Sequence, residues 1–474
     1  MKKYPIYTRH ERMLADTTTP VAIYLRIRDI FPNSILLESS EYHSRDNNVS
    51  YICCEPIAGI TLNEKELVFQ FPDSDTTLRK PKGSFDLKEE VQAFRNAFEA
   101  DKRLEPGLRV IPNGLFGYFT FDCIPLFEDL TLQSPKIAER QIPSLQYHLY
   151  RYVIAVDHFH NELHLFEHSF SENAESDLEK VRYLIQNKNF PEYNFNLEAE
   201  EASNMQDEDF IALVEKMKTH IFRGDVFQIV PSRAFSRKFS GDDFNVYRAL
   251  RSINPSPYLF YFDYGNFRLF GSSPEAQLTI RNKEATIFPI AGTFKRTGNL
   301  AEDQLKALEL QNDPKESAEH VMLVDLARND LSRHCRNVHV KSYKETHFYS
   351  HVIHLVSKVS GELEDLSKSF HVVADTYPAG TLSGAPKHRA IQLIDAYENY
   401  SRSFYSGAIG YMGFEGDFNH AIMIRSFLSQ QNTLHYQAGA GIVADSVPEM
   451  ELKEVDNKIA ALRKAMEIAE SINN

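Results

Sequence analysis

The chain has 474 residues, with 42% hydrophobic and 25% charged residues, which are ordinary values for a globular protein large enough for two domains. Its formal net charge of −14 argues against a general nucleic-acid binder, because phosphate recognition needs a basic face. An anionic substrate would need locally placed cations, or a divalent metal, to offset this negative field.

Cysteine usage and the lack of long apolar runs indicate the compartment. The chain has four cysteines and no C-x-x-C pair, which argues against a disulfide framework and a zinc ribbon and indicates a reducing environment. Residues 1–20 lack the apolar core of a signal peptide, and no apolar run approaches the ~20 residues that span a bilayer. We therefore expect a cytoplasmic protein that engages neither nucleic acid nor a membrane.

Strand-like and helix-like segments alternate in the first half of the chain. Residues 34–40 (SILLESS), 150–159 and 162–168 have the composition of strands, and the last two predict a hairpin across His160 and Asn161. Residues 176–186 predict a helix. Residues 189–208 are polar and acidic without periodicity, which indicates a link between two halves.

The second half begins with a predicted amphipathic helix over residues 207–225. Apolar side chains recur there at positions 210, 213, 214, 217 and 221, and Gly224 ends the pattern. Further helices are predicted over 385–399, which begins near a proline, and over 447–472. Strands are predicted over 226–235, 258–271, 284–293, 404–428 (several, joined by glycine turns) and 433–446. Because glycine-rich turns concentrate in this half, we expect the chemistry here.

Two pairs of glutamates share a spacing of three residues. Glu316 and Glu319 would lie on one face of a helix, and Glu451 and Glu454 repeat the spacing near the start of the last helix. Mg²⁺ prefers carboxylate oxygens and keeps several waters, so two such helices could face one metal and leave positions for substrate oxygens. The alternative is that acidic residues early in a helix complement its dipole, and the pairs alone favour that alternative.

Two glycine-rich turns are candidates for anion binding. Residues 378–387 (PAGTLSGAPK) form a turn that opens a helix, where free amides can hold an anion, although the segment does not match a P-loop. Residues 437–445 (QAGAGIVAD) do not fit a dinucleotide-binding fingerprint. Together with Arg425 they indicate a site for a small molecule with several negative charges; the alternative is a pair of tight structural turns.

Three histidines occur in the segment HFYSHVIH. On a helix, His347, His351 and His354 would converge and could bind zinc. The alternating, β-branched residues of this region predict a strand instead, on which His351 and His354 point to opposite faces, so a zinc site is disfavoured and a single catalytic histidine remains open. The chain has no G-x-S-x-G nucleophile motif and no G-x-C-x-G cysteine typical of a built-in glutaminase.

Several long motifs occur in order, and they cover nearly all of the second half with weaker matches in the first. The motifs are DVFQIVPSR, NPSPYLFYFD, GSSPE, PIAGT, EHVMLVDLARNDL, HLVSKVSGEL, GTLSGAPK, YSGAIGY, IMIRS, QAGAGIVADS and EVDNK. Through them the chain resembles the chorismate-utilising enzymes, and within that family the large (component I) subunits of anthranilate synthase.

This resemblance implies an α/β (α+β) fold with an antiparallel-rich β core sandwiched by outer helices. Residues 1–190 would form an N-terminal domain that contributes a tryptophan feedback site, and residues 205–474 a chorismate-binding catalytic domain. The implied activity is a Mg²⁺-dependent lyase reaction of tryptophan biosynthesis, in which chorismate and ammonia give anthranilate and pyruvate.

The resemblance also assigns a metal and a substrate site. Glu319 and Glu454 would bind Mg²⁺, with Glu316 and Glu451 helping directly or through water, which reverses the preference for the dipole alternative. The metal would hold the ring carboxylate of chorismate. The remaining substrate contacts would come from Arg425 and Tyr405 on the enolpyruvyl carboxylate, from Gly292, Thr293, Gly439, Ala440 and Gly441 as close backbone and polar contacts, and from Lys458 as additional charge.

Four further residues would take part in the reaction itself. Glu275, in GSSPE, would be the general acid that helps the C4 hydroxyl leave while ammonia adds at C2. His354 would assist the later loss of pyruvate, and Thr381 would lie in the same wall. Relatives that add water carry a lysine base where this chain has Gln228, and many aminodeoxychorismate synthases carry a nucleophilic lysine where it has Ala291. Both positions favour anthranilate.

The first half resembles the part of the family that senses tryptophan. Glu38 and Ser39 (in LLES) would bind the amino group of tryptophan, and Pro257, Tyr258 and Leu259 (in NPSPYL) would form the opposite wall. Relatives often carry methionine in place of Leu259, so the sensitivity to tryptophan could differ. For LLES alone, the alternative is a buried strand.

With no glutaminase motif in this chain, ammonia is expected from a separate glutamine amidotransferase subunit, and the resemblance implies that the two kinds of chain form a complex, often a heterotetramer. Three rival interpretations remain. The nearest is an enzyme that stops at 2-amino-2-deoxyisochorismate, which differs only in the lyase step. A catalytically dead tryptophan sensor is disfavoured because Glu275, His354 and the four glutamates are all present. A plain Mg²⁺-binding scaffold would not need Arg425 and Gln228 in matching motifs.

Overall fold

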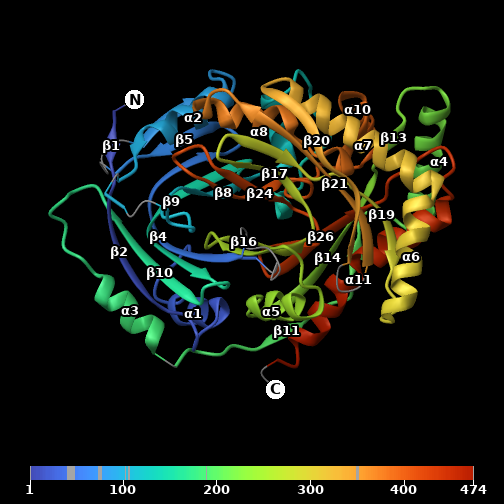
Figure 1. Cartoon of the computed structure of the whole chain (residues 1–474). Helices are drawn as coiled ribbons and strands as arrows, with labels where there is room; N and C mark the ends of the chain where they lie inside the picture. Colours follow the sequence, from blue (N-terminus) through green and yellow to red (C-terminus); the bar gives the residue numbers. More distant parts are fainter. Residues whose placement is uncertain are drawn as a thin grey trace.

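In the computed structural model, antiparallel strands from both halves of the chain join into one connected network (Figure 1). The structure describes residues 2–39, 48–72, 77–101, 103–104, 107–187, 189–348 and 352–472. The strands are β1 (Tyr4–Pro5), β2 (Tyr7–Leu14), β3 (Ile35–Glu38), β4 (Val49–Leu62), β5 (Glu66–Gln70), β6 (Thr77–Pro81), β7 (Phe98–Glu99), β8 (Leu115–Phe119), β9 (Leu145–Asp157), β10 (Glu162–Ser169), β11 (Phe195–Leu197), β12 (Ala202–Ser203), β13 (Gln228–Ile229), β14 (Ser232–Gly241), β15 (Tyr258–Asp263), β16 (Phe267–Ser273), β17 (Ala276–Arg281), β18 (Glu284–Ile287), β19 (Ile290–Lys295), β20 (Cys335–Phe348), β21 (Val352–Leu363), β22 (Gly384–Ala385), β23 (Ala408–Met412), β24 (Phe418–Ile422), β25 (Ser426–Gln430) and β26 (Thr433–Gly439).

Two branches of this network leave the long strand pair β4–β9. One branch runs through β3, β15, β16, β25, β26 and β14. The other runs through β8, β23, β24, β17 and β18 to β21, which β20 flanks on its opposite edge. Ile35 and Phe260 of the first branch belong to the same buried cluster as Phe116 and Ile409 of the second. Part of the core therefore lies between the two branches, as in a packed pair of sheets.

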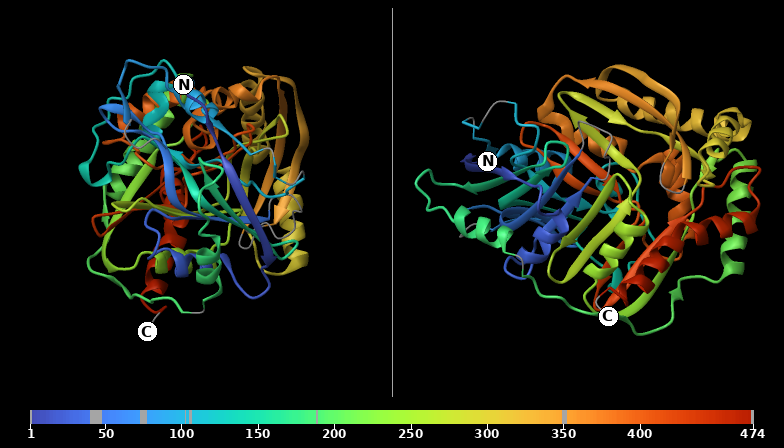
Figure 2. Two further views of the ribbon diagram at one scale, coloured as in Figure 1. Left: turned by 90° about the vertical axis from the view of Figure 1, so that its left-hand side faces the viewer. Right: turned by 60° about the horizontal axis from the view of Figure 1, so that its bottom comes forward.

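Helices cover the outer faces of the strands. In Figure 1, α2, α8, α10 and α7 lie along one side of the network, and α1, α3, α5 and α11 along the other. The last helix, α11, drawn in red in Figure 2, packs against α4, α5 and β26. This arrangement confirms the predicted fold class. The helices are α1 (Pro20–Ile27), α2 (Leu87–Asn96), α3 (Leu178–Gln186), α4 (Asp207–Phe222), α5 (Phe244–Ile253), α6 (Leu300–Asn312), α7 (Pro314–Ser332), α8 (Ser369–Thr376), α9 (Gly380–Ser383), α10 (Lys387–Tyr397) and α11 (Pro448–Ala469).

Local sequence signals account for most of the helix ends. Gln206 and Asp209 form a capping box at the start of α4, and Gly224 follows its end with φ 80°. Pro386 caps α10 and Pro448 occupies the first turn of α11, where a missing N–H costs nothing. The predicted hairpin is confirmed, since β9 pairs with β10 and Asn161 turns with φ 54°.

Four predicted segments differ from the structure. Residues 189–208 are more than a link, because they contribute the short strands β11 and β12, which pair with β14. Their hydrogen bonds come from an edge strand distant in the sequence, which local composition does not reveal. The predicted single strands over 226–235, 258–271 and 284–293 are each divided, at Pro231, at Gly265 (φ 82°) and at Pro289. Proline lacks the N–H that a strand ladder needs, and glycine permits the turn.

The strand network crosses the boundary between the two predicted domains. Strand β3 pairs with β15, and β8 pairs with β23, so strands of the first half continue directly into those of the second. The division into residues 1–190 and 205–474 stays a prediction.

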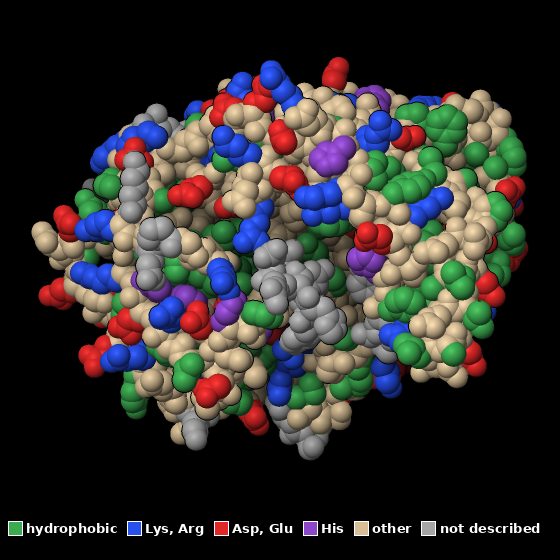
Figure 3. Space-filling view, viewed as in Figure 1, with side chains coloured by type: hydrophobic (Ala, Val, Ile, Leu, Met, Phe, Trp, Pro, Cys, Tyr) green, Lys and Arg blue, Asp and Glu red, His purple; other side chains and the backbone are tan. Residues whose placement is uncertain are grey.

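On the face shown in Figure 3, basic and acidic side chains are interspersed. Among the described residues, no helix combines the length and apolar content needed to cross a bilayer.

Candidate functional site

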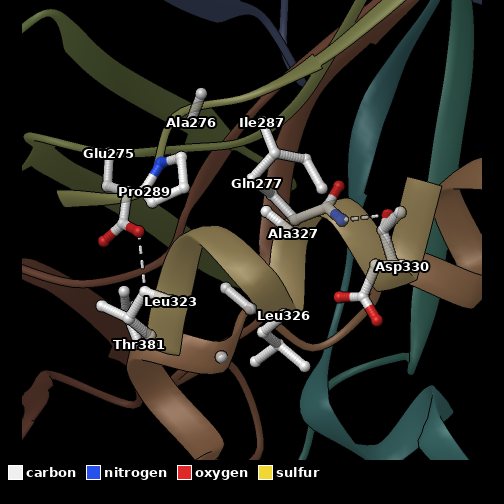
Figure 4. A pocket seen from close by; sticks show the side chains of 13 residues that line it. Glu275, Ala276, Gln277, Ile287, Pro289, Leu323, Leu326, Ala327, Asp330 and Thr381 are labelled. Atoms are coloured by element: carbon white, nitrogen blue, oxygen red, sulfur yellow. Dashed lines mark hydrogen bonds between the residues drawn. The ribbon is translucent and has the colours of Figure 1, made fainter. Parts of the chain in front are cut away.

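The carboxyl group of Glu275 is buried where β16 ends and β17 begins. Thr381 of α9 donates its hydroxyl to Oε1 of Glu275 at 2.9 Å, a contact drawn in Figure 4. Burial raises the pKa of Glu275 to about 8, although the hydrogen bond from Thr381 and the nearby charge of Lys458 act in the opposite direction. Near neutral pH the group therefore carries a proton, which is the state that a general acid needs.

The imidazole of His354 is oriented by the backbone of a neighbouring strand. His354 lies on β21, and its Nδ1 is 2.9 Å from the carbonyl oxygen of Gly292, so Nδ1 carries the proton and donates it. Burial, together with the cations Arg425 and Lys458, lowers the pKa of His354. The ring is then neutral near pH 7, and Nε2 is its basic nitrogen. Gly292 makes this geometry possible with φ 71° at an irregularity in the pairing of β19 with β21.

A group of cationic and hydroxyl side chains lies at the end of β26. Lys458 of α11 donates to the carbonyl oxygen of Gly439 at 2.8 Å and pairs with Glu454 at 2.6 Å. The guanidinium of Arg425 donates to the carbonyl oxygen of Lys458. Tyr405 is buried, and a Cβ on Gly439 would come 3.3 Å from its hydroxyl. These side chains make a positively charged wall suited to a carboxylate.

Arg425 adopts an unusual backbone conformation. Its φ of 50° lies in the left-handed region, which is uncommon for residues other than glycine, asparagine and aspartate. Burial lowers the pKa of Arg425, partly offset by Tyr405 and Glu454, and the group stays charged. Strain of this kind is often found where a side chain must be aimed at a ligand.

Gln228 lies between the second turn of the predicted metal helix, α7, and the glycine turn after β26. Its Nε2 donates to Oε1 of Glu319 at 2.7 Å, and its Oε1 is buried without a hydrogen-bond partner among the described residues. A Cβ on Gly441 would come within 2.9 Å of Nε2 of Gln228, so any larger residue at this position would push the Gln228 amide aside. Strand β13 carries Gln228, which is directly opposite Ala385 of β22. The other residue of β22, Gly384, has φ 130°.

The four glutamates predicted to hold Mg²⁺ lie on α7 and α11, as expected. All would present carboxylate oxygens, the ligand type that Mg²⁺ prefers, and a Cβ on Gly292 would come within 3.1 Å of Oε2 of Glu316. In this structure Glu319 accepts from Gln228 and Glu454 pairs with Lys458. No group of three or more His, Cys, Asp or Glu side chains in the described part of the chain is close enough to hold a metal ion. The four carboxylates are the type of donor that Mg²⁺ prefers, so the residue types fit this ion. To form the metal site, however, these side chains would have to reorient.

The remaining predicted substrate residues border the same region. Ala440 is buried, and its N–H donates to the carbonyl oxygen of Pro231. Ala291 lies on β19 beside Gly292, and the side chain of Thr293 is outside the described part of the structure. His354 lies on β21, as the predicted strand requires, and is directly opposite His347 of β20. His351 lies outside the described residues, so the prediction that His351 and His354 point to opposite faces stays a prediction.

The residues predicted to sense tryptophan meet across two strands. Glu38 of β3 is directly opposite Leu259 of β15, next to Tyr258. The carboxylate of Glu38 is buried and already has two strong partners, since Tyr247 donates to Oε2 at 2.6 Å and Arg251 donates Nε at 2.9 Å. The structure thus brings the two motifs together and adds Tyr247 and Arg251, which sequence reasoning missed.

A buried ion pair supports two of the site segments. Arg402 donates to Oε1 of Glu398 at 2.6 Å, and also to the carbonyl oxygens of Leu382 and Val230 at 2.7 and 2.6 Å. It therefore ties the segment after Gln228 to the segment that carries Thr381. In the sequence this pair has the i, i+4 spacing of a common exposed helix pair, so no local signal distinguishes it.

Comparisons with known proteins identify the family of this chain. The family described as chorismate binding enzyme matches residues 33–464. Anthranilate synthase component 1 of Aquifex aeolicus (strain VF5) is 36% identical over 98% of this chain and 95% of its own, and that of Bacillus subtilis (strain 168) is 35% identical over 98% and 92%.

Solved structures give the same result. The crystal structure of anthranilate synthase component I from Streptococcus pneumoniae TIGR4 superposes with a TM-score of 0.76 and 29% identity, covering 96% of this chain and 99% of that one. The menaquinone-specific isochorismate synthase of Escherichia coli, at 20% identity and a TM-score of 0.73, shares the fold over 98% of this chain and 95% of that one. The family model matches residues 33–464, and a relative that is 36% identical covers 98% of this chain. This chain therefore belongs to the chorismate-binding enzymes.

Proposed function

We propose that this chain is the large subunit of anthranilate synthase, which converts chorismate and ammonia to anthranilate and pyruvate in the tryptophan pathway. Relatives about 36% identical over nearly the whole chain carry that name. The observation that carries the proposal is the buried acid Glu275 in a site that contains Gln228 instead of a lysine base. Glu275 can protonate a leaving hydroxyl, and Gln228 cannot deprotonate water as a lysine base at its position would, so these two residues favour ammonia as the nucleophile.

In the first step, Glu275 is the general acid. The nitrogen lone pair of ammonia forms the bond to C2 and gives an ammonium group, which returns one proton to the Glu275 carboxylate afterwards. Both ring double bonds shift by one position, and the C4–oxygen bond breaks with its electron pair on oxygen. That oxygen takes the proton of Glu275 and leaves as water. Thr381 keeps the carboxyl group in place through its 2.9 Å hydrogen bond. Gln228, whose Oε1 is a buried acceptor, is suited to receive an N–H of ammonia.

In the second step, His354 is the candidate base. The proton on C2 must be removed while the bond to the enolpyruvyl oxygen breaks and pyruvate leaves. Nδ1 of His354 donates to Gly292, so Nε2 carries the lone pair, and the lowered pKa keeps it unprotonated near neutral pH. Arg425 and Tyr405 would bind the enolpyruvyl carboxylate, assisted by Lys458.

Glu316, Glu319, Glu451 and Glu454 would hold Mg²⁺, which when bound supplies charge neutralisation for the ring carboxylate. The proposal also includes a glutamine amidotransferase partner, in a heterotetramer, as the source of ammonia. Feedback inhibition by L-tryptophan would act through Glu38, Ser39, Pro257, Tyr258 and Leu259. The reaction is placed in the cytoplasm, in keeping with four buried, free cysteines.

The proposal is tested by mixing the purified chain with chorismate, Mg²⁺ and ammonium at mildly alkaline pH and following anthranilate fluorescence. Parallel reactions contain EDTA or L-tryptophan. Fluorescence that needs the metal and falls with tryptophan supports the whole proposal. Loss of chorismate without fluorescence would indicate 2-amino-2-deoxyisochorismate as the product. Untouched chorismate would favour the sensor interpretation.

A further inference from the structure

Arg402 is a buried cation whose hydrogen-bond donors are all used. Its side chain is 1% exposed, and that of its partner Glu398 is 5% exposed. A guanidinium has five N–H donors. Two of them donate to the two carboxylate oxygens of Glu398, at 2.6 and 2.9 Å. The other three donate to the carbonyl oxygens of Val230 and Leu382, at 2.6 and 2.7 Å, and to the hydroxyl of Ser406, at 3.4 Å.

The two carbonyl oxygens belong to segments that carry residues assigned to the reaction. Val230 lies two residues after Gln228, and Leu382 follows Thr381 in α9. Because α9 has only four residues, the carbonyl oxygen of Leu382 has no partner within the helix, and the guanidinium supplies one. The rigid plane of Arg402 therefore sets how the Gln228 segment lies relative to the Thr381 segment.

Arg402 also supports Tyr405, which is predicted to bind the enolpyruvyl carboxylate. The guanidinium carbon lies 5.6 Å from the centroid of the Tyr405 ring, a distance typical of a cation–π contact. The carbonyl oxygen of Arg402 accepts the N–H of Tyr405 at 3.1 Å. Tyr405 and Leu382 also belong to the same small buried cluster. One buried cation thus contacts three segments of the candidate site.

Glu398 fixes the guanidinium to the strand network. Its Oε1 accepts the N–H and the hydroxyl of Ser232, at 2.9 and 2.7 Å, and Gln437 donates to the same hydroxyl at 2.7 Å. Ser232 lies on β14 and Gln437 on β26, and these two strands are paired. The guanidinium therefore cannot tilt without breaking several buried hydrogen bonds.

We propose that Arg402 is a positioning residue for the first step of the reaction, because it holds the hydroxyl of Thr381 against Glu275 and fixes the backbone that carries Gln228. This inference rests on the proposed function and assigns the step in which the ion pair acts. Apolar residues in place of a buried ion pair often give equal or greater stability. They could not supply directed hydrogen bonds to carbonyl oxygens of two different segments.

Thr381 transmits the effect of Arg402 to Glu275. Its hydroxyl donates to Glu275 at 2.9 Å and favours the ionised form, so it opposes the rise in pKa that burial causes. Figure 4 shows the two side chains facing each other. A shift of the backbone at Leu382 would lengthen this hydrogen bond, and the pKa of Glu275 would rise further.

Other charged groups lie around Glu275. Lys458 of α11 lowers its pKa electrostatically. Asp330 of α7 lines the same pocket and is paired with Lys387 of α10 at 2.7 Å, so this pair is close to neutral. All three groups stay in place when Arg402 or Thr381 is replaced, so a change in the pKa of Glu275 then reports on the hydrogen bond from Thr381.

The functional test uses Arg402→Lys, which keeps the charge beside Glu398. An ammonium group has no planar fork, so it cannot reach both carbonyl oxygens. The basic limb of the pH profile of kcat/KM for chorismate, measured at fixed free ammonia, should move upward by about one pH unit. Thr381→Val should move it equally, and the double variant no further. The loss of kcat/KM caused by Arg402→Lys should be at least about fivefold smaller in the Thr381→Val background.

The matched control is Arg28→Lys. Arg28 also makes a two-pronged pair, with Asp242 at 3.1 and 2.6 Å, but it lies at the end of α1. This variant should leave the basic limb in place and kcat/KM within about twofold of the unmodified chain. If Arg402→Lys also leaves the limb in place and lowers kcat/KM by the same factor in both backgrounds, Arg402 is only structural and the proposal is overturned.

A crystal structure of Arg402→Lys gives a test that needs no turnover. The distance from the Thr381 hydroxyl to Glu275, 2.9 Å in the unmodified chain, should lengthen beyond the hydrogen-bond limit of about 3.5 Å. An unchanged distance would overturn the proposal even if the chain makes anthranilate, so this result is separable from failure of the proposed function. Should Arg402→Lys not fold, Glu398→Gln, which weakens the same anchor, is tested for the same shifts.

Discussion

Replacing Glu275 with glutamine should inactivate the protein and yet stabilise it at alkaline pH. The pKa of Glu275 is raised from 4.5 to about 8 by burial. Below pH 4.5 the carboxyl group is protonated in both the folded and the unfolded chain, so it carries no penalty. As the pH rises from 4.5 to 8, the folded state binds more protons than the unfolded state, and stability falls by about 5 kcal/mol in total. Above pH 8 the penalty is constant.

Glutamine has the same shape and can still accept the hydrogen bond of Thr381, but it never ionises. The entropy of unfolding is about 2.1 cal/mol/K per residue, so a chain of 474 residues changes its Tm by about 1 °C per kcal/mol. The Tm of Glu275→Gln, relative to the unmodified chain, should therefore rise by about 4 °C between pH 5 and pH 9. Anthranilate formation should fall by about 10²- to 10⁴-fold, the usual contribution of a general acid.

The measurement is thermal unfolding of both proteins at pH 5, 7 and 9, together with the fluorescence assay. Glu208→Gln, at an exposed position of α4, is the matched control and should show no such change. If the difference in Tm between Glu275→Gln and the unmodified chain is the same at pH 5 and pH 9, burial does not hold this carboxyl group protonated, and its assignment as the acid fails.

Three further changes test other parts of the structure. Arg402→Met would leave Glu398 as a buried charge without its partner, which costs about 3–5 kcal/mol, so the Tm should fall by several degrees; an unchanged Tm would mean that the pair contributes little. Arg251→Met frees Glu38 from its guanidinium partner, and the concentration of L-tryptophan for half-inhibition should fall by about tenfold, whereas a rise would show that Arg251 helps to bind the inhibitor. EDTA should abolish anthranilate formation, and Glu319→Gln should weaken activation by Mg²⁺ by at least about tenfold in a titration; activity that survives chelation would refute the metal site.

Sequence patterns predicted a part of the regular elements, where the signals are local, but not helices such as α1, α2 and α5 or strands such as β4 and β20. Helix α4 has a capping box, an apolar stripe and a glycine after its end, and the hairpin of β9 and β10 has an asparagine in the left-handed conformation. The failures have a non-local cause. Residues 195–197 form a strand only because β14 offers an unpaired edge, and no pattern within the segment records that edge.

The candidate site was found through motifs, and the structure brings part of it together. Thr381 contacts Glu275, and His354 contacts the carbonyl oxygen of Gly292, whereas the four glutamates form no group able to hold a metal ion among the described residues. The sequence could not predict Tyr247 and Arg251 as partners of Glu38, however, since they lie on α5, far from β3 in the chain.

By itself, the sequence determined the residue types on which the chemistry depends: an acid at Glu275, an amide at Gln228, oxygen donors on two helices and glycines at Gly292 and Gly441. Only the tertiary structure decided their ionisation and orientation. Burial, which depends on elements distant in the chain, keeps Glu275 protonated, and a carbonyl oxygen on β19 selects the tautomer of His354. A pKa and a tautomer depend on the surrounding dielectric and on hydrogen-bond partners, and these exist only once the chain has folded.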